Sequence, residues 1–255
     1  MTLINYNSYR SKKGYNSRVR FLVFHYTAAN FSASINALTG ASVSAHYLIP
    51  DFTDPSYLKA GFNEPQIFNL VEETQRAWHA GVSSWGNRSN LNDTSIGVEI
   101  VNLATDNQGQ FTFPPYTAQQ IEAIEYLALD ILKRYPDISP VNVVAHSDIA
   151  AGRKSDPGPM FPWHALYLKG IGAWFDDTTQ KTFLQAYQAN GIPLREQLLA
   201  LFKKYGYDTS AATTCAGFQR LVRAFQLHFR PAKYDGVMDI ETAANLAALV
   251  KKYCP

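Results

Sequence analysis

Residues 141–158 have the sequence VNVVAHSDIAAGRKSDPG, which decides how the first part of the chain folds. The stretch begins with a short, valine-rich run, so residues 142–145 are predicted to form a buried strand. The strand delivers His146 to its carboxyl end, and a loop containing Lys154 and Asp156 follows. Functional side chains commonly lie on loops at such strand ends. We therefore expect a site at this edge of a sheet.

Four further segments have the composition of strands, because they are short, rich in valine, isoleucine and aromatic residues, and bounded by turn-forming residues. These segments are residues 19–26, 45–49, 66–70 and 95–101. Residues 117–135 instead show an apolar stripe at helical spacing, with Thr117 and Gln120 placed as a capping box and Pro136 as the stop. The combination predicts an α/β fold with a mixed central sheet flanked by helices.

The sequence changes character at residues 170–179, where we predict a domain boundary. Beyond it the strand pattern disappears, and Asp239 is placed to cap the last of three amphipathic helices. These predicted helices are residues 194–205, 217–229 and 240–253. We therefore predict an α/β domain over residues 1–175 and a small all-α, three-helix domain over residues 176–255. The second domain holds no cluster of acid–base or metal-binding residues of its own, so we interpret it as a binding or interface domain.

Composition excludes several classes of protein. Hydrophobic residues make up 46% of the 255 residues, enough for a substantial core. A formal net charge of +2 without a basic run gives no indication of nucleic-acid binding. No apolar stretch approaches the roughly 18 residues of a membrane span, and the polar start lacks the apolar core of a signal peptide. Cys215 and Cys254 are compatible with either a disulfide or two free thiols.

A second histidine, His25, also follows an apolar run. Taken singly, a histidine after a strand is often a hydrogen-bonded core residue, and Asp156, which precedes Pro157, is often a turn residue bonded to its own backbone. Taken together, His25, His146 and Asp156 favour a metal site. Two histidines and one carboxylate suit zinc, and three protein ligands leave a position for water, as in catalytic zinc sites.

Glu99 is the candidate for acid–base chemistry. It lies in the apolar strand 95–101, where a carboxylate is costly unless it is paired or functional. Burial would raise its pKa toward that of a general base, whereas an ion pair with a buried lysine or arginine is the structural alternative. We favour the catalytic role. Lys154 places a positive charge beside the predicted metal ligands, where a reacting oxygen could sit.

Trp78 and His79 are candidates for substrate binding, because an adjacent indole and imidazole could line a groove for a sugar or a peptide. A structural hydrogen-bonding role is an equally good interpretation for His79 and the better one for His46. His164 and His228 carry no functional signal, and His228 lies on a predicted helix of the second domain.

At these residues the chain resembles the zinc-dependent N-acetylmuramoyl-L-alanine amidases of the AmpD and AmiD type, which share a fold with peptidoglycan-recognition proteins. The matching segments, in family order, are residues 24–28 (FHYTA), 44–49 (SAHYLI), 77–83 (AWHAGVS), 92–99 (NDTSIGVE) and 146–158. Residues 224–231 (AFQLHFRP) and 234–236 (YDG) resemble the three-helix peptidoglycan-binding module of longer members. The chain is therefore more similar to the extended AmpD homologues than to the single-domain recycling enzyme.

This resemblance implies that His25, His146 and Asp156 bind zinc, that Glu99 is the acid–base residue and that Lys154 is the oxyanion partner. It implies hydrolysis of the amide between N-acetylmuramic acid and L-alanine of the peptidoglycan stem peptide. Two alternatives stay open, a recognition protein that binds peptidoglycan without cutting it and a peptidase that cuts within the stem peptide.

Peptidoglycan and muropeptides are the implied partners, and both a homo-oligomer and an inhibitor or immunity protein are compatible with the sequence. The expected site of action is the periplasm or cell wall. Three routes fit: a trimmed form of an exported or lipid-anchored enzyme, a cytoplasmic enzyme for recycled fragments, and a toxin delivered by a secretion system. The last of these best fits a wall-binding chain without a leader.

Overall fold

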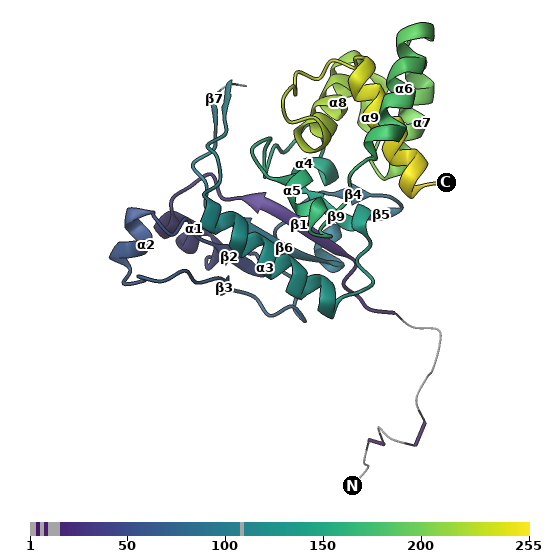
Figure 1. Cartoon of the computed structure of the whole chain (residues 1–255). Helices are drawn as coiled ribbons and strands as arrows, with labels where there is room; N and C mark the ends of the chain where they lie inside the picture. The colour runs from purple at the N-terminus through teal and green to yellow at the C-terminus, as the bar shows by residue number, and fades with distance from the viewer. Residues whose placement is uncertain (1–3, 6–7, 10–15, 108–109) are drawn as a thin grey trace.

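The computed structural model describes residues 4–5, 8–9, 16–107 and 110–255. At its centre is a five-stranded sheet with strand order β3-β2-β6-β1-β9, in which only β3 runs antiparallel to its neighbour (Figure 1). The strands are β1 (Phe21–Tyr26), β2 (Tyr47–Ile49), β3 (Phe68–Asn69), β6 (Ser95–Ile100) and β9 (Val143–Ala145). Each lies within one of the five predicted segments, and the predicted α/β class is confirmed.

Helix α3 (Ala118–Arg134) runs across one face of this sheet (Figure 1). The predicted capping box is present, because the Gln120 amide donates to the Thr117 hydroxyl and the Thr117 amide donates to the Gln120 side chain. The Gln120 side chain also donates to the Val101 carbonyl at 2.7 Å, which ties the helix to the end of β6.

Shorter elements were not predicted, because they contain too few residues to show a period. The helices among them are α1 (Phe31–Leu38), α2 (Pro55–Lys59), α4 (His146–Ile149) and α5 (Trp163–Leu168), with 3₁₀ turns η1 (Leu91–Asp93), η2 (Pro140–Asn142) and η3 (Ser210–Thr213). Two hairpins pair β4 (Ser84–Trp85) with β5 (Arg88–Ser89), and β7 (Thr105–Asn107) with β8 (Gln110–Thr112). The second hairpin projects from one end of the sheet (Figure 1).

The C-terminal part is helical, as predicted. It contains α6 (Asp177–Asn190), α7 (Arg195–Tyr205), α8 (Cys215–Phe229) and α9 (Ile240–Tyr253), which gather at one end of the molecule (Figure 1). The predicted cap of α9 is confirmed, because the Asp239 side chain accepts from the Thr242 amide. Helix α6 was not predicted, because its residues are largely polar and none of them is fully buried. Cys215 and Cys254 are free thiols.

The two parts share their interior, because the buried apolar side chains of the sheet and of the C-terminal helices form one continuous cluster. Trp85, in the hairpin beside the sheet, packs edge-on against Tyr207 with ring centroids 4.7 Å apart. Trp163 of α5 stacks on His228 of α8 at 3.7 Å. Within the described residues, no helix has both the length and the apolar character needed to cross a membrane.

Candidate metal centre and active site

Three predicted site residues meet because of the strand register. His25 near the end of β1 pairs with Glu99 of β6, and Phe24 pairs with Ala145, which immediately precedes His146. Paired residues of neighbouring parallel strands point to the same face of a sheet. The carboxyl edge of the sheet therefore presents His25, Glu99 and His146 side by side, and the loop after α4 brings Asp156 back to them.

The candidate metal ligands form a small triangle. His25 Nδ1, His146 Nδ1 and Asp156 Oδ2 lie 2.9 Å from one another, and all three side chains are buried. Zinc binds nitrogen and oxygen ligands at about 2.0–2.2 Å, so one ion can contact all three atoms at once. The donor set of two imidazoles and one carboxylate, gathered at bonding distance, fits a zinc ion.

Hydrogen bonds on the far side of His146 leave its Nδ1 atom free to bind a metal. His146 Nε2 lies 3.1 Å from the carbonyl of Ala80, which can only accept. The imidazole therefore donates from Nε2, and in its neutral form the lone pair is on Nδ1. Arg153 donates to the same carbonyl at 3.0 Å and to that of Val82, which holds this segment against residues 146–156.

A longer chain of hydrogen bonds does the same for His25. The Ser95 hydroxyl donates to the Leu91 carbonyl at 2.6 Å, so its oxygen accepts from His79 Nε2 at 3.0 Å. His79 then accepts through Nδ1 from His25 Nε2, at 2.9 Å. His25 is thereby left with its lone pair on Nδ1, the atom that faces Asp156. The Leu91 carbonyl thus determines which ring nitrogen carries the proton in both His79 and His25.

The position of His79 is built into the surrounding backbone. Its amide and that of Ala80 both donate to the Asn92 side chain, at 3.1 and 2.7 Å. Its ring lies on β6 at Gly97, where a Cβ atom would come within 2.3 Å of the imidazole. Glycine is unfavourable inside a strand and marks a place where another group approaches closely. At residue 97 that group is His79.

The two buried carboxyl groups of the site, Asp156 and Glu99, have pKa values shifted in opposite directions. Burial opposes ionisation of Asp156, but the nearby His146 and His25 outweigh it and hold its pKa well below the usual range. Burial and the neighbouring Asp156 together raise the pKa of Glu99 well above its usual value, with Lys154 acting in the opposite sense. Burial and His146 lower the pKa of His25 to about 4. Asp156 is therefore an anion and His25 is neutral, as metal ligands must be.

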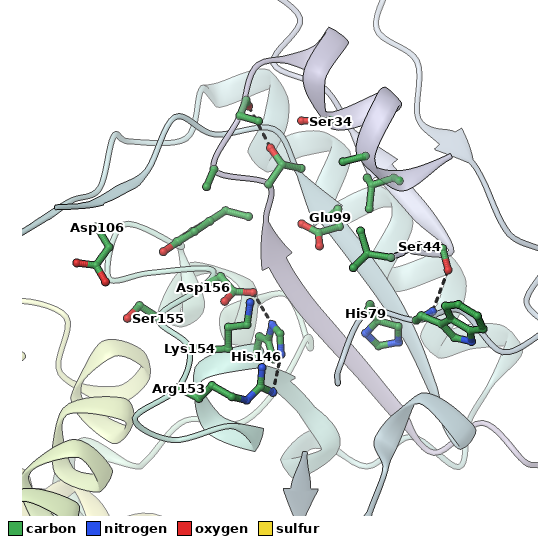
Figure 2. A pocket seen from close by; sticks show the side chains of 18 of the residues that line it. Ser34, Ser44, His79, Glu99, Asp106, His146, Arg153, Lys154, Ser155 and Asp156 are labelled. Atoms are coloured by element: carbon green, nitrogen blue, oxygen red, sulfur yellow. Dashed lines mark hydrogen bonds and ion pairs between the residues drawn. The ribbon is translucent and has the colours of Figure 1, made fainter. Parts of the chain in front are cut away.

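These groups open into a pocket of about 340 Å³ lined by Glu99, His146, Lys154 and Asp156 (Figure 2). Glu99 Oε2 is enclosed, yet it has no hydrogen-bond partner among the described residues. The Lys154 side chain is exposed in the pocket, and its ammonium group forms no ion pair or hydrogen bond within the described part of the chain. The pocket therefore presents an unpaired carboxyl oxygen of Glu99 and the unpaired ammonium group of Lys154 beside the candidate metal ligands.

The remaining candidates differ in their surroundings. Trp78 is at the pocket rim with 52% of its surface exposed, whereas His79 is 8% exposed and is bonded to His25. His46 is enclosed, because Gly97 donates to its Nδ1 and its Nε2 faces the Gln75 carbonyl. Ser95, which supports His79, was not predicted from the sequence, although its segment is one of those that carry the family resemblance.

Comparisons with known proteins identify the family of the chain. Residues 15–159 match the family described as N-acetylmuramoyl-L-alanine amidase. The N-acetylmuramoyl-L-alanine amidase AmiD of Escherichia coli K12 is 45% identical over 238 residues, which span 92% of this chain and 84% of the relative.

Two solved structures extend the comparison to the whole chain. AmpDh3 of Pseudomonas aeruginosa in complex with anhydromuramic pentapeptide is 59% identical, covers 99% of both chains and superposes with a TM-score of 0.97. E. coli AmiD in complex with an anhydro-N-acetylmuramic acid tripeptide substrate is 43% identical over 96% of this chain and 93% of its own, with a TM-score of 0.84. The chain belongs to the N-acetylmuramoyl-L-alanine amidase family, and it is a hydrolase of the amide bond for which that family is named.

Proposed function

We propose that His25, His146 and Asp156 bind a zinc ion that serves the hydrolysis of the amide between N-acetylmuramic acid and L-alanine. The observation that carries the proposal is the 2.9 Å triangle of ligand atoms, in which each histidine presents a bare Nδ1 atom. When bound in such a site, zinc lowers the pKa of a water molecule and polarises a carbonyl group.

Glu99 is proposed to move the protons of the reaction. Its enclosed Oε2 atom has no partner among the described residues, so it is available to take a proton from the attacking water. A pKa above the usual carboxylate value suits a base that must later return the proton to the departing amine. General acid–base catalysis of this kind typically contributes about 10²- to 10⁴-fold in rate.

Lys154 is proposed to stabilise the negative charge that develops on the carbonyl oxygen. Its exposed ammonium group lines the same pocket as Glu99. A preorganised donor at such a position typically contributes about 2.7–4 kcal/mol. Trp78 at the rim is proposed to pack against the sugar or the peptide. For His79, the bond to His25 favours support of the ligand over contact with substrate.

The substrate is proposed to be the wall polymer or its soluble fragments, with the periplasm or cell wall as the place of action. The resemblance of residues 224–236 to a peptidoglycan-binding module supports a second polymer-binding surface in residues 176–255. Such a surface would raise the local concentration of the pocket at the wall. Residues 1–175 would then form the catalytic domain.

Metal removal tests the zinc proposal. We expect chelator-treated protein to lose amidase activity, and one equivalent of zinc to restore it. Glu99→Gln is expected to keep zinc but lose about 10²- to 10⁴-fold in turnover. A metal-free protein that stays fully active would contradict the role of zinc, and near-normal turnover in the variant would remove Glu99 from the mechanism.

A competition experiment tests the second surface. Full-length Glu99→Gln protein is sedimented with insoluble peptidoglycan while a soluble muropeptide saturates the pocket. Binding that survives the competitor is expected if residues 176–255 hold the polymer. Complete displacement by the muropeptide would locate all of the polymer binding in the pocket.

A further inference from the structure

Residues 146–156, which we call the ligand loop, carry two of the candidate metal ligands together with Lys154. We propose that helix α8 and Tyr207 of the C-terminal part are a structural element of the metal site, because they hold the ligand loop in the shape that binds metal. The inference rests on the proposed function, since it concerns the same metal site. It gives the C-terminal helices a role beyond any contact with the wall.

The first contact is a buried carboxylate two residues after His146. Asp148 accepts three hydrogen bonds, from the Ala145 amide at 2.8 Å, the Tyr207 hydroxyl at 2.6 Å and His228 Nδ1 at 2.7 Å. Its side chain is fully buried, and that of His228 is 2% exposed. A buried carboxylate is stable only when it is fully hydrogen-bonded, so Asp148 depends on both donors from the C-terminal part.

The donors themselves are held in place by packing. His228 lies between the rings of Trp163 and Phe229, with centroids at 3.7 and 3.8 Å. Tyr207 packs against Trp85 at 4.7 Å. His228 lies on a helix, as predicted, and the structure adds that it is enclosed and paired with a carboxylate 80 positions away. Its partner, Asp148, carries no signal in the sequence that distinguishes it from a helix-capping residue.

Two more contacts follow along the ligand loop. Arg220 packs on Gly152, where a Cβ atom would lie 2.7 Å from the arginine Cδ. Arg223 donates to the Ser155 hydroxyl at 3.0 Å. Viewed down the axis of α8, Arg223 and His228 lie about 60° and about 80° to either side of Arg220, because each residue turns the helix by about 100°. Helix α8 therefore contacts the loop near its beginning, middle and end.

These contacts lie next to the two candidate metal ligands of the loop, His146 and Asp156. Asp148 binds the amide of Ala145, so it fixes the junction of β9 and α4 from which His146 projects. The Ser155 contact lies next to Asp156. If the donors from the C-terminal part are removed, the two ligands should lose their fixed separation. Metal affinity should then fall even while the chain remains folded, because outer contacts that orient ligands typically contribute 10- to 100-fold in affinity.

Tyr207→Phe is the sharpest test, because it removes one hydroxyl and keeps the ring. Tyr205→Phe is the matched control, since Tyr205 is buried two residues away and its hydroxyl forms no hydrogen bond within the described part of the chain. Zinc affinity of each full-length protein is measured by competition with a chromophoric chelator, at a temperature where circular dichroism shows all of them folded. We expect Tyr207→Phe to bind zinc about tenfold or more weakly, and Tyr205→Phe to match wild type.

Excess zinc distinguishes positioning from a general loss of structure. It is expected to restore turnover of a soluble anhydromuropeptide by Tyr207→Phe. Arg223→Met tests the contact with Ser155, should Tyr207→Phe not fold. It keeps most of the aliphatic stem of Arg223, which lies at a partly exposed position. This variant is expected to weaken zinc binding as well. If both variants bind zinc as tightly as wild type, this inference is contradicted while the proposed function still stands. Wild-type protein that binds no zinc would contradict the proposed function and this inference with it.

Discussion

The two histidines of the candidate metal centre owe their orientation to hydrogen bonds on the far side of each ring. For His146 the partner is the Ala80 carbonyl, and for His25 it is His79, oriented by Ser95. An imidazole that donates from Nε2 keeps its lone pair on Nδ1, which is the general way in which outer residues prepare a histidine ligand. The nitrogen that each histidine offers to a metal is therefore set by groups outside the candidate ligand triangle.

Substitution of His79 tests this account at the scale of one residue. His79→Asn places a side-chain oxygen close to the position of Nδ1, so it can still accept from His25 Nε2. His79→Leu removes the acceptor at similar volume. We expect the leucine variant to bind zinc about 10- to 100-fold more weakly and the asparagine variant to stay close to wild type. Equal zinc affinity in the two variants would contradict the hydrogen-bond chain.

Burial of neutral His25 makes the stability of the metal-free protein depend on pH. Burial and His146 lower the pKa of His25 to about 4, whereas an unfolded histidine titrates near 6.5. Between these values the unfolded chain takes up a proton that the folded chain refuses, so stability falls as pH falls from 6.5 toward 4. From pH 7 to pH 5 the loss due to His25 is about 2 kcal/mol.

Urea unfolding in the presence of a chelator measures this loss. The unfolding free energy of wild type should decrease between pH 7 and pH 5 by about 2 kcal/mol more than that of His25→Asn, which lacks the titrating ring. Because His79 and Asp156 interact electrostatically with His25, the difference between the two proteins reports the titration of His25 together with its coupling to these neighbours. The same pH dependence in both proteins would show that His25 does not titrate as described.

At the scale of elements, strand β6 combines two functions, because it presents Glu99 to the pocket and supports the ring of His79 at Gly97. In Gly97→Ala the new methyl group would overlap that ring, and overpacking of this kind typically costs about 1–3 kcal/mol. We expect zinc affinity to fall as well, because His79 is displaced. The measurements are the unfolding free energy and the chelator competition.

Gly61→Ala is the control for this substitution. Residue 61 has a φ of +92° but open space around its missing Cβ, so alanine there should cost about 1–2 kcal/mol through backbone strain alone. Its zinc affinity should be unchanged. A Gly97→Ala protein that resembles the Gly61→Ala protein in both measurements would show that the approach of His79 to β6 has no consequence for the metal site.

The sequence predicted the elements and residues whose signal is local. All five strands of the sheet and the capped helix α3 each follow from a few consecutive residues. The three ligand candidates follow from two strand ends and one loop taken together. The hairpin β7–β8 and helix α6 lacked such a signal, because one is short and the other is polar along most of its length. Gly97 carried a signal that could have been used, because glycine in an apolar strand indicates a close approach.

Local sequence patterns could not predict the contacts that support the site. His79 and His25 are 54 positions apart, and His228 and Asp148 are 80 apart. The first pair depends on how the segment that carries His79 packs on the sheet, and the second on how the C-terminal helices pack against α4. No periodicity encodes either contact. For this reason Ser95 and Asp148 were not predicted to support the site, although both lie in segments that carry the family resemblance.

At the scale of the whole molecule, the shared core predicts a single unfolding transition. The buried cluster runs from the sheet into α7, α8 and α9 without interruption, and Asp148 adds a polar link between the parts. We expect urea unfolding followed by circular dichroism and by tryptophan fluorescence to give coincident curves. Two separate transitions would instead show that residues 1–175 and 176–255 unfold as independent domains.

The most direct test of the central claim is mass spectrometry of peptidoglycan digested in ¹⁸O-labelled water by zinc-loaded and by chelator-treated protein. We expect only the zinc-loaded protein to release stem peptides that begin with an unlabelled L-alanine amine, with ¹⁸O in the lactyl carboxylate of the muramic acid. Release of shortened peptides that carry ¹⁸O at a peptide carboxylate, or equal cleavage without zinc, would contradict the account.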